Sequence, residues 1–338
     1  MIPARAPRAR RAEGKLLVLD VARARIDDRA LGELPALLDP EDLLVVNDAA
    51  TLPASLRGRA GQAPIELRLL ARALDGSWRA VLFGAGDWTT PTERRPAPPV
   101  LAAGDRLELG ELVARIEAVA PESARLVRVR FASEGARFWS ALYRAGKPVQ
   151  YSYLERPLEL WDVQTSYAAR PWAVEAPSAG FPLTGGVLAA LQRRGVRLAT
   201  LTHAAGLSAT GDAALDALLP LGERFEIPAP TVSAIERAHA RGARVIAAGT
   251  SVVRALEGRA LEGAGILQPG AGETTLRIGP GYRRRVVDAL LSGMHEPAES
   301  HYALLQAFAP RALLDQARSS AEAWDYRGHE FGDACLIV

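Results

Sequence analysis

The feature that most constrains the fold is a change in sequence pattern between residues 56 and 149. Within this block, residues 65–72, 78–84, 111–119 and 125–131 have the composition of short strands, and no long helical pattern separates them. In the last of these, Val127 and Val129 alternate with arginines, as expected for a half-buried strand. The block therefore predicts a small antiparallel β-barrel or β-sandwich.

Turn and loop signals divide this block further. The dipeptides Asp75-Gly76 and Gly104-Asp105 predict hairpins. A cluster of prolines between residues 91 and 99 predicts an exposed loop.

On either side of the block, helical and strand patterns alternate. Residues 15–20 and 42–48 predict buried strands, and the leucine spacing over 30–38 predicts a helix broken by its central proline. Further along, the patterns predict helices at 184–194, 230–241, 250–259, 300–308 and 311–323, and strands at 196–201 and 243–249. We therefore expect a split α/β main domain, residues 1–55 and 150–338, with residues 56–149 inserted into it.

Composition limits the function classes. The 338 residues carry a net charge of only +2, but among the 41 basic residues Lys15 and Lys147 are the only lysines. Codon bias in a GC-rich genome explains such an excess of arginine, and so would an RNA substrate, because guanidinium groups bind phosphates and stack on bases. With 39 acidic residues diluting the positive charge, composition favours the first explanation.

No targeting or membrane segment is predicted. Uninterrupted apolar runs such as residues 245–248 are far shorter than the roughly 18 residues of a transmembrane helix. The basic residues 1–11 are not followed by the apolar core of a secretory signal. Since Cys335 is the only cysteine, a disulfide within the chain is excluded, and we expect a cytoplasmic protein.

The first candidate site is Gly249-Thr250-Ser251, where a buried strand runs directly into a helix. A helix start of this kind attracts anions, although Thr250 or Ser251 could equally be a simple N-cap. Arg254 lies about one turn further, on the helix face of Thr250, and could reinforce a carboxylate or phosphate site or be a solvated arginine.

The second candidate is MHEPAESH, residues 294–301, with two histidines and two glutamates. Because Pro297 interrupts a helix through His295 and Glu296, the helical HExxH zinc arrangement is excluded and a metal is not expected. A role for His295 as general acid or base is the better interpretation.

The other histidines give weaker signals. His239 falls in the last turn of a helix, where a cation suits the helix dipole. His203 follows a buried strand, at the edge where α/β proteins collect site residues, and His329 beside Glu330 could belong to a site or to packing. No Walker loop, GxGxxG or GxSxG motif is present in the sequence.

Taken together, seven segments resemble those of a known family. In order, they are RRAEGKLLVLD, DLLVVND, LPASLRG, VQTSYAARPWAVEAPSAGFPLT, ARVIAAGTSVVRALE, RRVVDALLSGMHEP and FGDACLI. The order and spacing are similar to those of the S-adenosylmethionine:tRNA ribosyltransferase-isomerases of queuosine biosynthesis. One such segment would be a weak signal, whereas seven in order are specific.

The resemblance implies an α/β domain with an inserted β-barrel. It also implies that S-adenosylmethionine is a co-substrate, without a metal, and that its ribosyl part is transferred to 7-aminomethyl-7-deazaguanine in the anticodon stem-loop of tRNA. Isomerisation then gives epoxyqueuosine, and adenine and methionine are released. A monomer is expected.

By motif position the resemblance also implies site residues. Those expected to be catalytic are His295, Asp288 and Arg254, and those expected to bind S-adenosylmethionine are Gln164, Thr165, Gly249, Thr250, Ser251 and Asp333. Arg254 would hold an anion together with the helix start at Thr250, His295 would transfer a proton, and Gln164 would contact a base edge.

Departures from the family pattern leave two alternatives. Where the family has arginines, this chain has Ala50 and Ser55. A diverged enzyme that uses S-adenosylmethionine with an acceptor other than tRNA is one alternative, and a non-catalytic RNA-binding protein is the other.

Overall fold

The computed structural model describes residues 1–297 and 300–338. Its main sheet has nine strands in the order β16-β14-β13-β4-β15-β17-β19-β2-β3. In chain order these are β2 (Lys15–Asp20), β3 (Arg25–Ala30), β4 (Leu43–Asn47), β13 (Arg197–His203), β14 (Glu223–Ile227), β15 (Val245–Ala248), β16 (Gly270–Thr274), β17 (Ala289–Gly293) and β19 (Ala334–Ile337). Strands β13, β4, β15 and β17 are parallel, whereas β19 runs antiparallel to β17 and parallel to β2.

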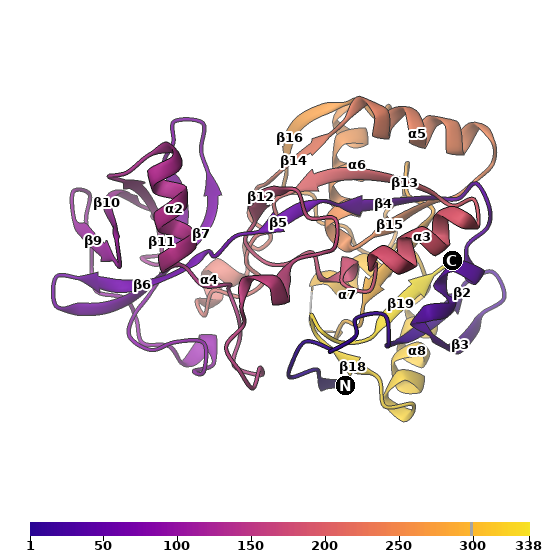
Figure 1. Cartoon of the computed structure of the whole chain (residues 1–338), viewed down its shortest axis with the longest axis horizontal. Helices are drawn as coiled ribbons and strands as arrows, with labels where there is room; N and C mark the ends of the chain where they lie inside the picture. Colours follow the sequence, from indigo (N-terminus) through magenta and orange to yellow (C-terminus); the bar gives the residue numbers. More distant parts are fainter. Residues whose placement is uncertain (298–299) are drawn as a thin grey trace.

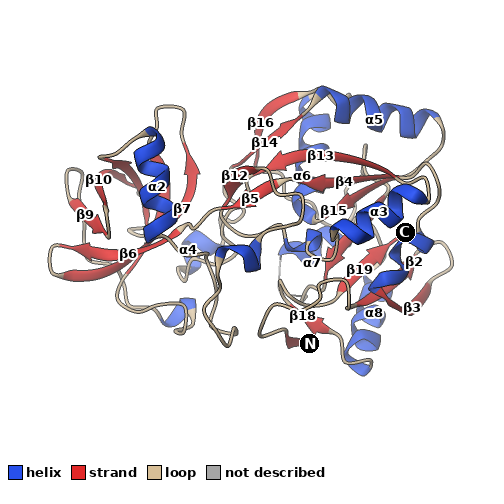
Figure 2. Ribbon diagram, in the orientation of Figure 1, coloured by secondary structure: helices blue, strands red, loops and turns tan. Residues whose placement is uncertain are grey.

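Helices cover both faces of this sheet (Figure 2). They are α1 (Leu34–Leu37), α3 (Gly185–Arg193), α5 (Ala229–Ala240), α6 (Thr250–Glu262), α7 (Ser300–Leu305) and α8 (Arg311–Ala323). Because side chains alternate along a strand, Leu16 and Val18 pack on the side of α1 and α3, while Leu17 and Leu19 pack on the side of α5, α6 and α8. The uninterrupted apolar runs of these strands therefore reflect burial on both faces.

The second body is a closed antiparallel barrel of six strands in the order β10-β11-β8-β7-β6-β9. The strands are β6 (Ser55–Ala60), β7 (Ala63–Arg72), β8 (Trp78–Phe83), β9 (Arg106–Leu109), β10 (Leu112–Val119) and β11 (Leu126–Phe131). In β11, Val127 and Val129 are buried and Arg128 is exposed, as their alternation predicts. The α/β fold with an inserted antiparallel barrel is thus confirmed, and a barrel is present rather than a sandwich (Figure 1).

One helix in this block was not predicted. Helix α2 (Gly135–Ala145) follows the last barrel strand, and its Phe138 and Leu142 are buried in the barrel core. Phe138 contacts Trp78 with ring centroids 5.8 Å apart. The helix was missed because it is short and lies at the end of a run of strands.

One turn prediction in this block is wrong. Gly104-Asp105 leads into β9 and does not join paired strands, since the hairpin of β9 and β10 turns at Gly110 and Glu111. By contrast, Asp75-Gly76 does turn between the paired strands β7 and β8. The proline-rich segment is a loop with one 3₁₀ turn and is mostly exposed or half-buried, as predicted, but Arg95 within it is only 4% exposed and its guanidinium bonds Glu66.

Two short strands carry the chain between the bodies. β5 (Ala49–Thr51) leads out and β12 (Arg170–Ala173) leads back, and the two pair in parallel. The remaining elements are β1 (Ile2–Pro3), β18 (Arg327–Gly328), α4 (Ala213–Asp216) and 3₁₀ turns at Leu31–Glu33, Thr92–Arg94, Leu160–Val163 and Ser178–Gly180. We propose residues 56–149 as an inserted domain, although its apolar core also takes in Leu207 and Leu215 from the returning chain.

Within the described residues, no helix combines the length and the apolar character required to cross a membrane.

Candidate active site

Several of the candidate site residues gather at one edge of the main sheet, where parallel strands end. Strands β15 and β17 are parallel neighbours, with Ala248 opposite Leu291. The next residues of the two segments, Gly249 and Ser292, therefore lie side by side. The Gly249 amide donates to the Leu291 carbonyl at 2.7 Å. Ala334, the first residue of β19, pairs with Gly293, so the residues just before β19 reach the same edge. In open α/β sheets ligands bind at this carboxyl edge.

Helix α6 begins at this edge. Gly249 precedes it with φ of 100°, in a region that side chains rarely adopt. A side chain at Gly249 would also place its Cβ 3.3 Å from the Cβ of Ala179. Thr250 and Ser251 are buried in the first turn. The tight turn therefore holds the helix start against the segment around Ala179.

Arg254 lies one turn into α6 in a buried charged cluster. Its Nη2 is 2.5 Å from Oε2 of Glu223, at the start of β14. Nε2 of His203, at the end of β13, is 3.4 Å from the same oxygen. The positive charge of Arg254 is thus matched by a carboxylate of this chain, whereas the resemblance implied that Arg254 would hold an anion.

Burial governs ionisation in this cluster. It raises the pKa of Glu223, an effect that the Arg254 guanidinium opposes. For His203, burial and then the nearby Arg254 lower the pKa well below its usual range, so the ring is neutral at pH 7. The cluster is thus an ion pair beside a neutral imidazole.

His295 lies just beyond the end of β17. Its Nε2 is 2.9 Å from the hydroxyl of Ser292, which is buried. Its ring stacks on that of His301, with centroids 5.0 Å apart. The serine and the second ring fix the orientation of the imidazole at the carboxyl edge. Glu299, the second glutamate of this segment, lies outside the described residues.

Asp288, which the resemblance implied to be catalytic, does not lie at this edge of the sheet. It precedes β17, so the length of that strand separates it from Ser292 and His295. Its Oδ2 accepts the Val245 amide at 2.8 Å and lies 3.5 Å from Nε2 of His239. Asp288 thus joins the amino ends of β15 and β17 to the end of α5.

Gln164 and Thr165 lie where the returning chain crosses the outgoing one. The Gln164 side chain accepts the Thr51 amide at 2.9 Å and donates to the Thr51 carbonyl at 2.8 Å. Its amide is therefore occupied by backbone, which argues against the predicted contact with a base edge. The buried hydroxyl of Thr165 has no hydrogen-bond partner in the described part of the chain.

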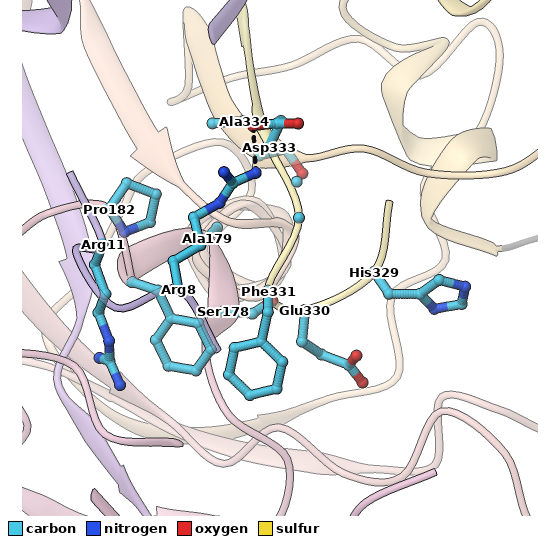
Figure 3. Close-up of a pocket in the computed structure, with 14 residues that line it drawn as sticks. Arg8, Arg11, Ser178, Ala179, Pro182, His329, Glu330, Phe331, Asp333 and Ala334 are labelled. Carbon is cyan, nitrogen blue, oxygen red and sulfur yellow. Dashed lines mark hydrogen bonds and ion pairs between the residues drawn. The ribbon is translucent and has the colours of Figure 1, made fainter. Parts of the chain in front are cut away.

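A pocket opens beside Ser292 and Gly293 (Figure 3). It is lined by residues from four segments that are distant in sequence, within 8–11, 178–182, 292–293 and 329–334. Asp333 lies in its wall, where its carboxylate accepts Arg8 at 2.5 Å and the amides of Lys15 and Arg327 at 2.8 Å each. Asp333 thus ties three segments together and shapes the pocket.

Glu330 is the site residue that sequence reasoning did not select. Its carboxyl lines the same pocket, and burial raises its pKa to about 7. Next to it, Phe331 stacks on Phe181 with centroids 5.4 Å apart and an interplanar angle of 4°. The available signal was the position of Glu330 directly before the FGDACLI motif, which begins at Phe331.

No group of three or more His, Cys, Asp or Glu side chains suited to a metal ion is found in residues 1–297 and 300–338.

Comparison with known proteins gives consistent matches along the whole chain. Residues 2–337 match the family model described as queuosine biosynthesis protein. An S-adenosylmethionine:tRNA ribosyltransferase-isomerase of Acidiphilium cryptum is 37% identical over 95% of this chain and 91% of its own length. The enzyme of the same name from Trichlorobacter lovleyi is 35% identical over 99% of this chain and 96% of its own length.

A solved structure is similar as well. The crystal structure of an S-adenosylmethionine tRNA ribosyltransferase from Thermotoga maritima superposes with a TM-score of 0.55 at 25% identity. The alignment covers 100% of this chain and 96% of the other.

Proposed function

The chain belongs to the queuosine biosynthesis protein family, and we propose that it transfers the ribosyl moiety of S-adenosylmethionine to 7-aminomethyl-7-deazaguanine in tRNA and isomerises it. The products are epoxyqueuosine in the tRNA, adenine and methionine. The observation that carries this proposal is a family match that runs from residue 2 to residue 337. An unbroken match favours retention of the whole reaction over retention of the S-adenosylmethionine pocket alone.

The reaction needs a group that removes a proton beside the sulfonium, and we assign this role to His295. The 2.9 Å contact between its Nε2 and the Ser292 hydroxyl supports the assignment, because Ser292 lines the pocket. A positioned imidazole nitrogen is suited to accept a proton. Ser292 acts as a positioning residue.

The methionine carboxylate needs a site for an anion, and we assign it to the turn of Gly249, Thr250 and Ser251. Free backbone N–H groups and the helix dipole favour negative charge there. Helix α6 has 13 residues, long enough for its dipole to contribute. The unpartnered hydroxyl of Thr165 offers a further donor.

The remaining predicted residues take structural roles in this proposal. Asp333 holds Arg8 in the pocket wall, Gln164 holds Thr51, and Arg254 neutralises Glu223. Asp288 is left out because it lies at the other edge of the sheet. The proposal places the reaction in the cytoplasm, on a monomer, with the anticodon stem-loop as the part of tRNA that is bound.

The test is a product assay. The protein is incubated with S-adenosylmethionine and an anticodon stem-loop carrying 7-aminomethyl-7-deazaguanine, and adenine release and the mass of the RNA are measured. We expect adenine and methionine in equal amounts with the modified RNA, and His295→Asn should lower the rate far more than the matched control Asp288→Asn.

Two other outcomes would replace the proposal. Binding of S-adenosylmethionine without affinity for the stem-loop would favour an enzyme with another acceptor. Steeply salt-dependent RNA binding without affinity for S-adenosylmethionine would favour a non-catalytic RNA-binding protein.

A further inference from the structure

Glu330 has no counter-charge in the described part of the chain. Its Oε2 is shielded from solvent and lacks a hydrogen-bond partner among the described residues. A carboxylate oxygen that is shielded from solvent and has no hydrogen-bond partner is costly, so a chain that keeps one either holds the group protonated or supplies a ligand for it.

The backbone around Glu330 holds it in place. His329 has φ of 63°, and its carbonyl accepts the Gly332 amide at 2.9 Å. A side chain at Gly332 would place its Cβ 2.3 Å from the Arg327 carbonyl oxygen, so only glycine fits there. A closed turn of this kind gives Glu330 little freedom to swing out into solvent.

The basic side chains of the pocket are already engaged. Arg8 bonds Asp333, as Figure 3 shows. Arg11 donates to the backbone carbonyls of Trp161, Asp162 and Gln164. The titratable or charged side chains that line the pocket with Glu330 are Arg8, Arg11, His329 and Asp333. Of these, His329 stacks on Tyr153 with centroids 4.3 Å apart.

The wall next to Glu330 is aromatic. Phe331 and Phe181 lie in parallel, and Figure 3 shows the side chains of Phe331 and Glu330 pointing to the same side of the turn. The Arg11 guanidinium already lies 4.7 Å from the Phe181 centroid, so the ring that remains for a ligand is Phe331. An aromatic ring beside a carboxylate suits a cation that carries apolar substituents, because the ring attracts positive charge and packs against the carbon groups. A sulfonium is such a cation.

We propose that Glu330 binds the positive charge of S-adenosylmethionine and gives up its proton as that charge enters the pocket. In this step the carboxyl O–H bond breaks, the proton passes to the solvent, and the resulting carboxylate faces the cation, so charge is conserved. The inference rests on the proposed function for the identity of the ligand. It makes Glu330 a specificity-determining residue that distinguishes a charged ligand from a neutral one.

The proposal predicts the proton count of binding. A group with a pKa of about 7 in the free protein should release about 0.9 proton per ligand at pH 6, about half at pH 7 and about 0.1 at pH 8. Because protonated Glu330 must lose its proton first, affinity should fall roughly tenfold per pH unit below pH 7 and level off above it.

The experiment is titration calorimetry of the intact protein with S-adenosylmethionine in buffers of different ionisation enthalpy. Glu330→Gln should bind more weakly at pH 8, release no proton, and show an affinity that is flat with pH. The matched control Glu111→Gln removes an exposed carboxylate on the barrel and should behave as the parent protein.

An analogue with an uncharged sulfur separates the two cations of the ligand. S-adenosylhomocysteine lacks the sulfonium charge and keeps the ammonium, so proton release only with S-adenosylmethionine assigns the sulfonium. Equal release with both ligands assigns the ammonium, and either result supports the proposal.

Other results would overturn it. If S-adenosylmethionine binds and no proton is released at pH 6, or if Glu330→Gln releases as many protons as the parent, Glu330 does not hold the cation, while the proposed function stands. If the parent protein does not bind S-adenosylmethionine at all, both fail. The parent measurement does not depend on the folding of any variant.

Discussion

The ion pair of Arg254 and Glu223 provides a quantitative test of how the carboxyl edge is held together. The two groups are 2.5 Å apart, and their side chains are only 11% and 7% exposed. Arg254→Met keeps a long apolar stem and removes the charge, which leaves Glu223 buried without a cation. Breaking a buried pair in this way should lower the free energy of unfolding by about 3–5 kcal/mol.

The loss should depend on pH. Burial raises the pKa of Glu223, and removal of Arg254 raises it further, so the folded variant binds a proton that the unfolded chain releases. A carboxyl with a raised folded-state pKa lowers stability as pH rises through that pKa. Urea unfolding should therefore show a smaller loss at pH 5 than at pH 8.

Two further variants complete the test. The double variant Arg254→Met with Glu223→Gln should recover part of the loss at pH 8, because no buried charge remains. Arg144→Met breaks the pair of Arg144 with Glu111, whose side chains are 57% and 59% exposed, and should leave stability nearly unchanged. If Arg254→Met were no more destabilising than Arg144→Met, or equally destabilising at both pH values, the account of a buried ion pair would be wrong.

Three other substitutions test the site. Ser292→Ala removes the hydrogen bond that orients His295 and should lower kcat about 10- to 100-fold with little change in KM, measured by adenine release; unchanged kcat would argue against His295 as the base. Asp288→Asn lies at the opposite edge of the sheet and should leave kcat unchanged, so a large loss would reinstate Asp288 as a functional residue. Gly249→Ala forces a side chain into φ of 100° against Ala179 and should lower the free energy of unfolding by about 1–3 kcal/mol, measured in urea; no loss would mean that the turn relaxes freely.

The main elements of the fold could be predicted because their signals are local. Buried strands such as β2 and β15 are continuous apolar runs. Helix α5 is followed closely by a glycine, and α8 begins directly after a proline. Strand β3, which pairs with β2 at the edge of the main sheet, was not predicted, because its sequence RIDDRA is polar and mostly exposed. The pairing of β3 with β2 depends on packing against the rest of the sheet, which the composition of the segment itself does not indicate.

The candidate site could be predicted only in part, because side-chain partners are not encoded locally. Motif position pointed to Asp288 and Gln164, and each proved to bond backbone atoms of a neighbouring strand. The pocket joins the amino-terminal segment to the turn before β19, through the pairing of β2 with β19 and of β19 with β17. Glu330 could be recognised as uncompensated only after the partners of Arg8 and Arg11 were known.

The arginine excess can now be interpreted from individual positions. Many arginines pair with acidic side chains of this chain, among them Arg59 with Glu108 and Arg197 with Glu41. The Ser55 hydroxyl donates to Glu66, whose carboxylate is already bonded by arginines of the barrel core. Since paired guanidinium groups add little net field, the number of arginines does not measure affinity for RNA. The positions of the arginines and their partners, which composition does not indicate, therefore carry the information about RNA binding.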